Sequence, residues 1–292
     1  MKIIITGGSG FLGYEVAKEL SKKYKVYIID IKKPKKKIQK NIIYINCDIK
    51  NYKKLEKLFK LNFKYVYHFA AISDIGESLK KPIETVETNI LVTAKLLELS
   101  LKYKVKRFIF ASTIYVYSDE GGFYKVSKKS SELYIKEYSK QFNLPFTILR
   151  FGTVYGPSFN FKNNINKIVY NAISKKIVSY EGSEKLYRKI IFISDAAKIS
   201  ANILVKKYKN KAVMITGKKR INIRTIMEKI RSKLDIKKKL KFENKIIMGH
   251  YISNPFKEKE IKNITITPKK EKNINQGIDE VINFIKSNST FF

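Results

Sequence analysis

Two side chains that could transfer a proton, Tyr124 and Lys128, stand four residues apart and would share one face of a helix expected at 124–142. A phenol with a pKa of about 10 is a poor base at neutral pH, but a neighbouring ammonium favours its ionised form. The apolar run 108–111 ends in Ser112 and Thr113, where a hydroxyl could hold a reacting oxygen. The spacing therefore predicts an acid/base group at Tyr124. Because the chain has 19 tyrosines and many lysines, a Tyr-Lys pair at this spacing could also belong to a helix with only a structural role.

A glycine-rich turn follows the first apolar run of the chain. Residues 6–13 read Thr-Gly-Gly-Ser-Gly-Phe-Leu-Gly, directly after Ile3-Ile4-Ile5 and before a helical pattern at 11–22. Such a turn presents bare backbone N–H groups and the positive end of a helix dipole to a pyrophosphate. It therefore predicts a dinucleotide-binding loop. The predicted contact residues of this loop are Gly7, Gly10, Phe11, Leu12 and Gly13.

The acidic residue Asp30 closes the second predicted strand, 25–30. A carboxylate at this place accepts hydrogen bonds from the adenine ribose and repels the 2′-phosphate of NADP, so it predicts NAD as the cofactor. The lysine-rich run 32–37 follows directly. Its cations could neutralise a 2′-phosphate, or the run could be a solvated loop broken by Pro34, and the sequence leaves both interpretations open.

Apolar runs alternate with helical patterns through the first half of the chain, which is typical of parallel strands joined by helical crossovers. We therefore predict an α/β fold with a Rossmann-type, doubly wound parallel sheet and a smaller C-terminal α/β lobe. The expected regions are an NAD-binding domain at 1–151 and a substrate-binding lobe at 152–292, with an interleaved boundary. The expected strands are 2–6, 25–30, 42–46, 64–69, 107–112, 145–150, 177–180 and 188–193, and the expected helices are 11–22, 51–60, 82–103, 124–142, 164–175, 194–207, 222–234 and 274–286.

The charge of the chain limits its partners. A formal net charge of +36 over 292 residues could attract nucleic acid, an anionic membrane or a phosphorylated substrate. The basic residues are spread along the whole length and only six are arginine, so we expect no specific nucleic-acid partner. No apolar stretch reaches the roughly 18 residues of a membrane span, and the first strand leaves no room for a signal peptide. A cytoplasmic protein without a membrane partner is expected.

Residues that usually hold metals are few. The single cysteine, Cys47, excludes an intramolecular disulfide and leaves no zinc cluster, so we expect no metal site. His68, at the end of an apolar strand, is expected to pack beside the cofactor rather than act as an acid. His250 is expected in a structural role, with contact to a substrate phosphate as the alternative.

Several further segments, together with the glycine-rich turn and the Tyr-Lys pair, resemble the extended short-chain dehydrogenase/reductase family. Within it they are similar to NAD-dependent epimerase/dehydratase proteins of the UDP-galactose 4-epimerase or UDP-glucose 4-epimerase type. The resemblance covers most of the chain. Its segments are Cys47-Asp48-Ile49, His68-Phe69-Ala70-Ala71, Gly76-Glu77-Ser78-Leu79-Lys80-Lys81-Pro82 with Asn89 and Thr93, Arg150-Phe151-Gly152-Thr153-Val154-Tyr155-Gly156-Pro157, and Arg188-Lys189-Ile190-Ile191-Phe192-Ile193-Ser194-Asp195.

The resemblance implies further contacts with NAD. Asp48 and Ile49 would contact the adenine, and the strand-end residues Phe69 to Ala71 would line the cofactor. Lys81 and Asn89 would contact it as well. The complete set of cofactor-binding residues expected on these grounds is Gly7, Gly10, Phe11, Leu12, Gly13, Asp30, Asp48, Ile49, Phe69, Ala70, Ala71, Lys81, Asn89, Tyr124 and Lys128.

The resemblance also implies a substrate, a nucleotide-diphosphate sugar. Arg188 would clamp the diphosphate, a task that suits guanidinium geometry. The implied substrate-binding residues are Ser112, Thr113, Thr153 and Arg188, and the implied catalytic residues are Thr113, Tyr124 and Lys128. In this scheme the tyrosine removes the proton of the C4 hydroxyl and the threonine holds that oxygen. The lysine binds the ribose and lowers the tyrosine pKa. The nicotinamide takes the C4 hydride and returns it to the other face of a transient 4-keto sugar.

Departures from the family pattern narrow the reaction. Dehydratases carry a carboxylate just after the catalytic Ser/Thr, whereas this chain has Ile114 and Tyr115. The stretch from Thr113 to Tyr124 is short, and Thr153 replaces the usual asparagine, so the sugar and the nucleotide stay open. The leading hypothesis is an NAD-dependent nucleotide-sugar 4-epimerase. The alternatives are a nucleotide-4-keto-sugar reductase and, in another class, a noncatalytic NAD- or anion-binding module.

The resemblance implies an assembly too. The long helices expected at 82–103 and 124–142 correspond to helices that pair across a two-fold axis in the family. A homodimer is therefore expected. The resemblance also implies a role in cell-surface polysaccharide biosynthesis.

Overall fold

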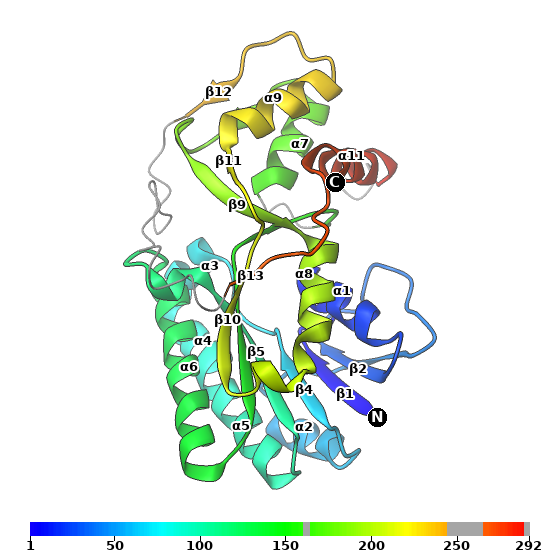
Figure 1. The fold of residues 1–292 in the computed structure, drawn as a ribbon, viewed down its shortest axis with the longest axis vertical. Helices are drawn as coiled ribbons and strands as arrows, with labels where there is room; N and C mark the ends of the chain where they lie inside the picture. Colours follow the sequence, from blue (N-terminus) through cyan, green and yellow to red (C-terminus); the bar gives the residue numbers. More distant parts are fainter. Residues whose placement is uncertain (160–163, 244–264, 289–292) are drawn as a thin grey trace.

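A computed structural model describes residues 1–159, 164–243 and 265–288. Its main feature is a sheet of eight parallel strands in the order β13-β10-β6-β5-β4-β1-β2-β3 (Figure 1). The strands are β1 (Lys2–Thr6), β2 (Lys25–Asp30), β3 (Ile42–Asn46), β4 (Tyr65–His68), β5 (Arg107–Thr113), β6 (Phe146–Phe151), β10 (Lys211–Ile215) and β13 (Thr265–Ile266). The expected doubly wound parallel sheet is therefore confirmed.

Helices cover both faces of this sheet, as continuous apolar strands require. Ile3 and Ile5 of β1 pack against α1 (Phe11–Leu20) and α8 (Ile193–Ala201), and Ile4, between them, packs against the opposite layer. That layer contains α2 (Tyr52–Phe59), α5 (Val92–Lys102) and α6 (Gly122–Phe142). All three isoleucines are fully buried. The alternation of side chains along one strand thus fills two apolar cores.

The helix expected at 82–103 is built from three pieces. They are α4 (Pro82–Thr85), the π-helical turn η1 (Val86–Leu91) and α5. A short helix, α3 (Ile75–Lys80), comes before them and was not expected. Single π-helical turns shift the hydrogen-bond register by one residue and often lie at functional sites.

The C-terminal lobe lies at one end of the sheet (Figure 1). It has a three-stranded sheet in the order β11-β9-β7 and a two-stranded sheet of β12 and β8, and a third apolar core joins them to helices α7, α9 and α11. The elements are β7 (Thr153–Tyr155), α7 (Asn164–Lys175), β8 (Ser179–Tyr180), β9 (Tyr187–Phe192), β11 (Arg220–Asn222), α9 (Ile223–Lys233), β12 (Lys241–Phe242) and α11 (Ile274–Ser287).

The second half of the chain also completes the main sheet. Strand β10 pairs with β6 over five residues, β13 pairs with β10, and α8 packs on the sheet beside α1. Residues after 151 therefore contribute both to the main sheet and to the C-terminal lobe.

Candidate active site

The expected acid/base pair lies in the first turns of α6. This helix starts at Gly122 with Gly121 as its N-cap, and their φ angles of 49° and 107° lie in the left-handed region that glycine adopts without strain. Tyr124 is partly buried, and its hydroxyl shares a hydrogen bond with the Thr113 hydroxyl at the end of β5. The structure thus brings Tyr124 and Thr113 together.

Lys128, one helical turn after Tyr124, is almost completely buried. Its Nζ donates to the carbonyl of Ala111 at 2.8 Å and lies 4.6 Å from the ring centroid of Phe110. Burial lowers the pKa of Lys128 to about 7, against the carboxylate of Glu132, which raises it. The ammonium is therefore held by β5 in a site where its proton is easily lost.

The pKa of Tyr124 does not follow the expectation from the sequence. Burial raises the pKa of the phenol to about 12, and only the hydrogen bond with Thr113 lowers it. Lys128 does not have the predicted lowering effect, because its ammonium binds the Ala111 carbonyl instead of the phenol. This correction means that the polypeptide by itself stores the phenol in its protonated form.

The glycine-rich turn forms a cradle that only glycine fits. Gly7 has a φ of 68°, and a Cβ atom there would lie 2.5 Å from the Ala70 nitrogen. At Gly13 a Cβ atom would lie 2.2 Å from the Gly7 carbonyl oxygen. Gly10 is the N-cap of α1 and supplies no side-chain cap, so the first N–H groups of the helix lack a side-chain acceptor. Among the described residues the buried Ser9 Oγ also has no hydrogen-bond partner.

These features fit a pyrophosphate, because it would supply the acceptors that the first turn of α1 lacks. Phe11 and Leu12, also expected at this site, have side chains that pack against the apolar core of the C-terminal lobe. Contacts from them to a cofactor would therefore come from their backbone N–H groups.

Asp30 ends β2 beside the cradle. Its two carboxylate oxygens accept hydrogen bonds from the backbone nitrogens of Ser9, at 3.1 Å, and Lys32, at 3.2 Å. The carboxylate is thus fixed by backbone groups at the place where the sequence predicts a ribose contact.

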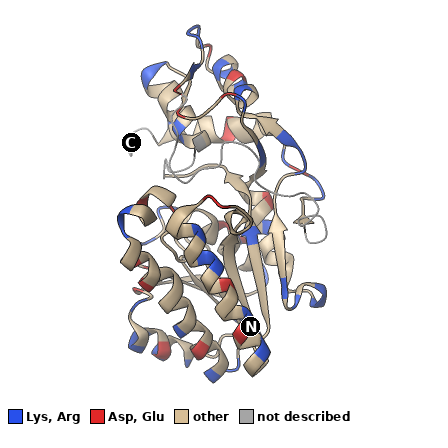
Figure 2. Cartoon of the chain, turned by 90° about the vertical axis from the view of Figure 1, so that its left-hand side faces the viewer, with Lys and Arg blue, Asp and Glu red and all other residues tan. Residues whose placement is uncertain are grey.

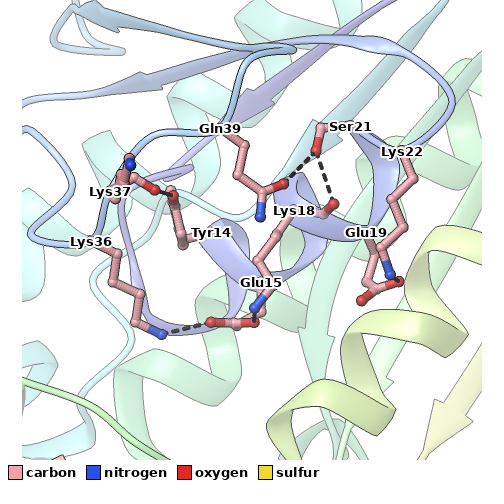
Figure 3. Close-up of polar contacts among 9 residues, drawn as sticks. All are labelled: Tyr14, Glu15, Lys18, Glu19, Ser21, Lys22, Lys36, Lys37 and Gln39. Atoms are coloured by element: carbon pink, nitrogen blue, oxygen red, sulfur yellow. Dashed lines mark hydrogen bonds and ion pairs between the residues drawn. The ribbon is translucent and has the colours of Figure 1, made fainter.

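The lysine-rich run after Asp30 is fastened to α1 (Figure 3). The Lys36 ammonium lies 2.6 Å from the Glu15 carboxylate, and the Tyr14 hydroxyl donates to the Lys37 carbonyl at 2.5 Å. Lys35 lies over the ring of Phe159, 4.9 Å from its centroid. Lys35 and Lys36 therefore have partners within the chain, which favours NAD over NADP. The run forms neither helix nor strand and its lysines are exposed except for the half-buried Lys36, which agrees with the interpretation as a solvated loop.

The adenine-side and lining residues have mixed surroundings. Asp48 is exposed and accepts a hydrogen bond from the Lys50 nitrogen at 2.8 Å, while the Ile49 side chain is buried in the core. Phe69 stacks on Tyr67, with ring centroids 6.3 Å apart. Ala70, the residue that approaches Gly7, is partly buried, as is Ala71. The cofactor contacts of these residues stay predictions.

Two residues expected to touch the cofactor have other partners. The Lys81 side chain is half exposed, and its ammonium lies 3.2 Å from Glu84. The Asn89 amide is buried; it accepts from the Ile72 nitrogen at 2.8 Å and donates to the Ile72 carbonyl and to Ser127 Oγ at 3.0 and 2.9 Å. With these bonds Asn89 connects the segment after β4 to α6, and its contact with the cofactor stays a prediction.

His68 belongs to a buried chain of hydrogen bonds. Its Nδ1 lies 2.6 Å from Thr6 Oγ1 and its Nε2 lies 3.0 Å from Thr93 Oγ1. Because the Thr93 hydroxyl donates to the Asn89 carbonyl, Nε2 must carry the proton and donate to Thr93. Burial lowers the pKa of His68 to about 3, so the ring is neutral. The other histidine, His250, lies outside the described residues.

The expected substrate-binding residues separate into two groups. Ser112 points away from Thr113, and its hydroxyl donates to Glu132 at 2.6 Å, so direct substrate contact by Ser112 is corrected to support of α6. Thr153 on β7 and Arg188 on β9 are partly buried. Since Thr153 pairs with Ile190, two residues after Arg188, both project from one face of the small sheet.

Sequence reasoning missed a buried ionic cluster next to the site. Arg150 on β6 donates from Nε to Glu132 at 2.9 Å and forms a second bond to it through Nη2. Its Nη1 donates to the Tyr117 hydroxyl at 2.5 Å. The carboxylate raises the pKa of Arg150 above its usual value despite the burial. The spacing of four residues from Lys128 to Glu132 was the available signal.

Metal sites and membrane-spanning helices were looked for only in the residues that the structure describes. No group of three or more His, Cys, Asp or Glu side chains that could hold a metal ion is found in those parts of the chain. None of the helices in those ranges is long and apolar enough to cross a membrane.

The fold and the site define the class of extended short-chain dehydrogenase/reductase proteins, in which a Tyr-Lys pair stands beside a dinucleotide cradle. The chain belongs to the NAD dependent epimerase/dehydratase family, whose model matches residues 3–217.

Three similar proteins illustrate this membership. UDP-glucuronic acid 4-epimerase from Bacillus cereus, solved in complex with UDP-glucuronic acid and NAD, superposes with a TM-score of 0.86 at 27% identity, covering 98% of this chain and 99% of that one. The UDP-glucuronate 4-epimerase of Thermodesulfobacterium geofontis is 27% identical over 67% of this chain and 69% of its own length. The dTDP-D-glucose 4,6-dehydratase of Dictyostelium discoideum is 32% identical over 66% of this chain and 53% of its own length.

Proposed function

We propose that this protein is an NAD-dependent 4-epimerase of a UDP-sugar. The observation that carries the proposal is the Tyr124–Thr113 hydrogen bond, one helical turn from the buried Lys128, in a fold whose glycine cradle fits a pyrophosphate. Two of the similar proteins are named UDP-glucuronate or UDP-glucuronic acid 4-epimerases. UDP-glucuronic acid is therefore the first substrate to test, beside UDP-glucose and UDP-N-acetylglucosamine.

The residues that would hold NAD follow from the cradle. The N–H groups at the start of α1, after Gly10, would bind its pyrophosphate, and Asp30 would accept hydrogen bonds from the adenine ribose. Lys128 would bind the nicotinamide ribose. When bound, NAD supplies a hydride acceptor that takes hydrogen from the C4 carbon of the sugar and gives it back on the other face.

The protein's own part of the reaction is a reversible proton transfer. The positive charge of a bound oxidised nicotinamide would favour the Tyr124 phenolate, which the polypeptide alone does not. This phenolate would accept the proton of the C4 hydroxyl as that carbon is oxidised to a ketone, and the phenol would return a proton to the same oxygen when the ketone is reduced. Thr113 holds this oxygen through both steps. No proton or electron is gained overall, so an epimerase ends each cycle with its cofactor unchanged.

The neighbourhood of Thr113 argues against a dehydratase, although one similar protein has that name. A dehydratase needs a group that removes a carbon-bound proton, and the turn η2 (Ile114–Tyr117) after Thr113 carries no carboxylate. A 4-keto-sugar reductase would use the same tyrosine but would consume reduced cofactor. A steady change of absorbance at the NADH maximum during turnover would therefore identify the reductase.

A noncatalytic anion-binding role finds little support in the placement of the charges. Figure 2 shows Lys and Arg spread over both lobes, together with Asp and Glu, rather than gathered on one surface. Steep, salt-dependent binding to nucleic acid that survives Tyr124→Phe would favour that role.

We propose a homodimer on the basis of two apolar stripes. Exposed residues at helical spacing occur along α4, η1 and α6, and soluble monomers seldom expose so many large apolar side chains in one region. They are Ile83, Val86, Leu91, Phe123, Val126, Leu133 and Tyr134. Sedimentation of the wild type and of Leu133→Glu measures the dimer directly; a wild-type monomer would contradict it.

The decisive experiment combines cofactor identification with turnover. Mass spectrometry of the denatured protein should find NAD, and incubation with the UDP-sugars should interconvert C4 epimers without net redox. Tyr124→Phe should lower kcat by about 10²- to 10⁴-fold while NAD stays bound, since it removes one oxygen. Full turnover by this variant would refute the assignment of the acid/base group.

A further inference from the structure

Glu132 connects the helix of the acid/base pair to the sheet. It lies on α6, one turn after Lys128, and is almost fully buried. Its carboxylate accepts hydrogen bonds from Ser112 Oγ at 2.6 Å, from Arg150 Nε at 2.9 Å and from Nη2 of the same guanidinium. Ser112 and Arg150 are register partners on β5 and β6. One side chain of α6 therefore binds two neighbouring strands.

The contacts of α6 with the end of β5 form a regular series. Lys128 binds the carbonyl of Ala111, Glu132 binds the hydroxyl of the next residue, Ser112, and Tyr124 binds the hydroxyl of Thr113. The three helical residues are spaced by four and share one face, and the three strand residues are consecutive. The Glu132 carboxylate accepts hydrogen bonds from the charged Arg150 as well as from the neutral Ser112. Hydrogen bonds that involve charged groups are stronger than those between neutral groups.

Arg150 extends this support to the turn after Thr113. Besides binding Glu132, it donates to the Tyr117 hydroxyl and lies over its ring, 4.7 Å from the centroid. Tyr117 ends η2, the turn that contains Ile114 and Tyr115. The cluster of Glu132, Arg150, Ser112 and Tyr117 thus underlies both the helix and the turn that flank Thr113.

We propose that Glu132 is a positioning residue of the epimerase site, which holds Tyr124 and Lys128 of α6 in register with Thr113 of β5. The proposal rests on the proposed function, because the distance that it controls is the one between the acid/base group and the hydroxyl that holds the reacting oxygen. In this role Glu132 itself contacts neither substrate nor cofactor. Its charge has a second effect, since the Glu132 carboxylate helps to keep a proton on the buried Lys128.

The first test replaces Glu132 with glutamine, which keeps the size and removes the charge. We expect kcat of Glu132→Gln to fall by about 10- to 100-fold with the KM for the UDP-sugar nearly unchanged, because small misplacements of reacting groups have effects of this order. The matched control is Glu228→Gln on α9, which loses a partly exposed pair with Arg231 whose atoms are 2.9 Å apart. The control should keep wild-type kcat.

A second variant separates the effect of the Glu132 charge from the effect of its side-chain length. Glu132→Asp keeps the carboxylate but is shorter by one methylene, so it should leave kcat low while the pH profile stays close to the wild type. In Glu132→Gln the limb of the profile that reports loss of the Lys128 proton should move to lower pH. Of the described titratable groups, those that interact electrostatically with Lys128 are Glu132 on α6 and His68 on β4, which is neutral. Arg150 on β6 is the ion-pair partner of Glu132.

A third measurement does not depend on turnover. Hydrogen exchange followed by mass spectrometry should show faster exchange in residues 111–113 and in the first turns of α6 of Glu132→Gln, with α2 unchanged. Unchanged kcat, pH profile and exchange would overturn the proposal. A fall of kcat that only follows a loss of folded protein or bound NAD would overturn it as well. If the wild type converts no UDP-sugar, the proposed function fails, and the exchange data still decide whether Glu132 holds α6 in register.

Discussion

The two lobes contain arginine–glutamate ion pairs that differ in their contact with water. In the Glu132–Arg150 pair beside the active site the side chains are 3% and 13% exposed, whereas those of Glu184 and Arg224 in the C-terminal lobe are 42% and 52% exposed. The buried pair also bonds to Ser112 and Tyr117. The comparison indicates where the molecule has fixed geometry: around the proposed acid/base group, and much less on the outside of the lobe.

The lobe obtains its stability from apolar packing instead. Residues such as Ile226 and Ile230 of α9, Ile278 of α11 and Val169 of α7 are fully buried in one core. The ion pairs found in the described part of the lobe are at least partly exposed, so solvent screens them and their contribution is small. The Glu132–Arg150 contact is therefore structural, whereas the Arg224–Glu184 contact is peripheral.

Removal of Arg150 tests this difference most strongly. Arg150→Met leaves the Glu132 carboxylate buried without a cationic partner, so we expect unfolding free energy to fall by about 3–5 kcal/mol. Urea denaturation followed by circular dichroism measures it. The double variant Arg150→Met/Glu132→Leu should recover much of the loss; if it is less stable than the single variant, the buried charge is not the cause.

A smaller effect is expected from His68, which is buried and neutral. Its pKa of about 3 in the folded protein lies below the unfolded value of about 6.5, so the unfolded chain binds the extra proton first as the pH falls. Stability should therefore be complete above pH 6.5 and decline by up to ~1.4 kcal/mol per unit between pH 6.5 and 3. Denaturation at pH 7.5 and 5.5 measures the decline. His68→Gln should show a shallower decline, and an equal one would contradict this assignment.

The smallest effect is expected at the exposed pair. Arg224→Met removes the contact with Glu184 and the stacking on Phe242, whose centroid lies 5.3 Å away. We expect a loss of about 0–1 kcal/mol, which decreases further in 0.5 M salt. The same denaturation assay compares it with Arg150→Met. Equal losses in the two variants would remove the distinction between the lobes.

Much of the first region could be predicted from the sequence because its signals are local. The run Ile3-Ile4-Ile5 before Gly7 indicates a buried strand and a phosphate-binding turn, and the Tyr124–Lys128 spacing indicates one helical face. Strand β10 was missed, because its apolar core is short and no periodicity marks it. The π-helical turn η1 was missed for another reason: no residue type marks the change from i→i+4 to i→i+5 hydrogen bonds.

Only those contacts of the site whose residues lie close together in the sequence could be predicted. Ser112 and Thr113 were expected to act together, yet neighbours on a strand face opposite sides, so only Thr113 reaches Tyr124. The partners of Asn89 lie 17 and 38 residues away in the chain, at Ile72 and Ser127, and no spacing rule connects them. Long-range contacts of this kind require the fold itself.

The pairing of β10 with β6 has a consequence for dissecting the protein. Five residue pairs join the two strands, from Thr147–Lys211 to Phe151–Ile215. A fragment that stops at residue 151 would turn β6 into an open edge, with unpaired backbone groups beside the fully buried Ile148 and Leu149. Such an edge is a template for intermolecular β-pairing, so the nucleotide-binding half cannot be isolated by cutting the chain at this point. It depends on a strand that is synthesised about 60 residues later.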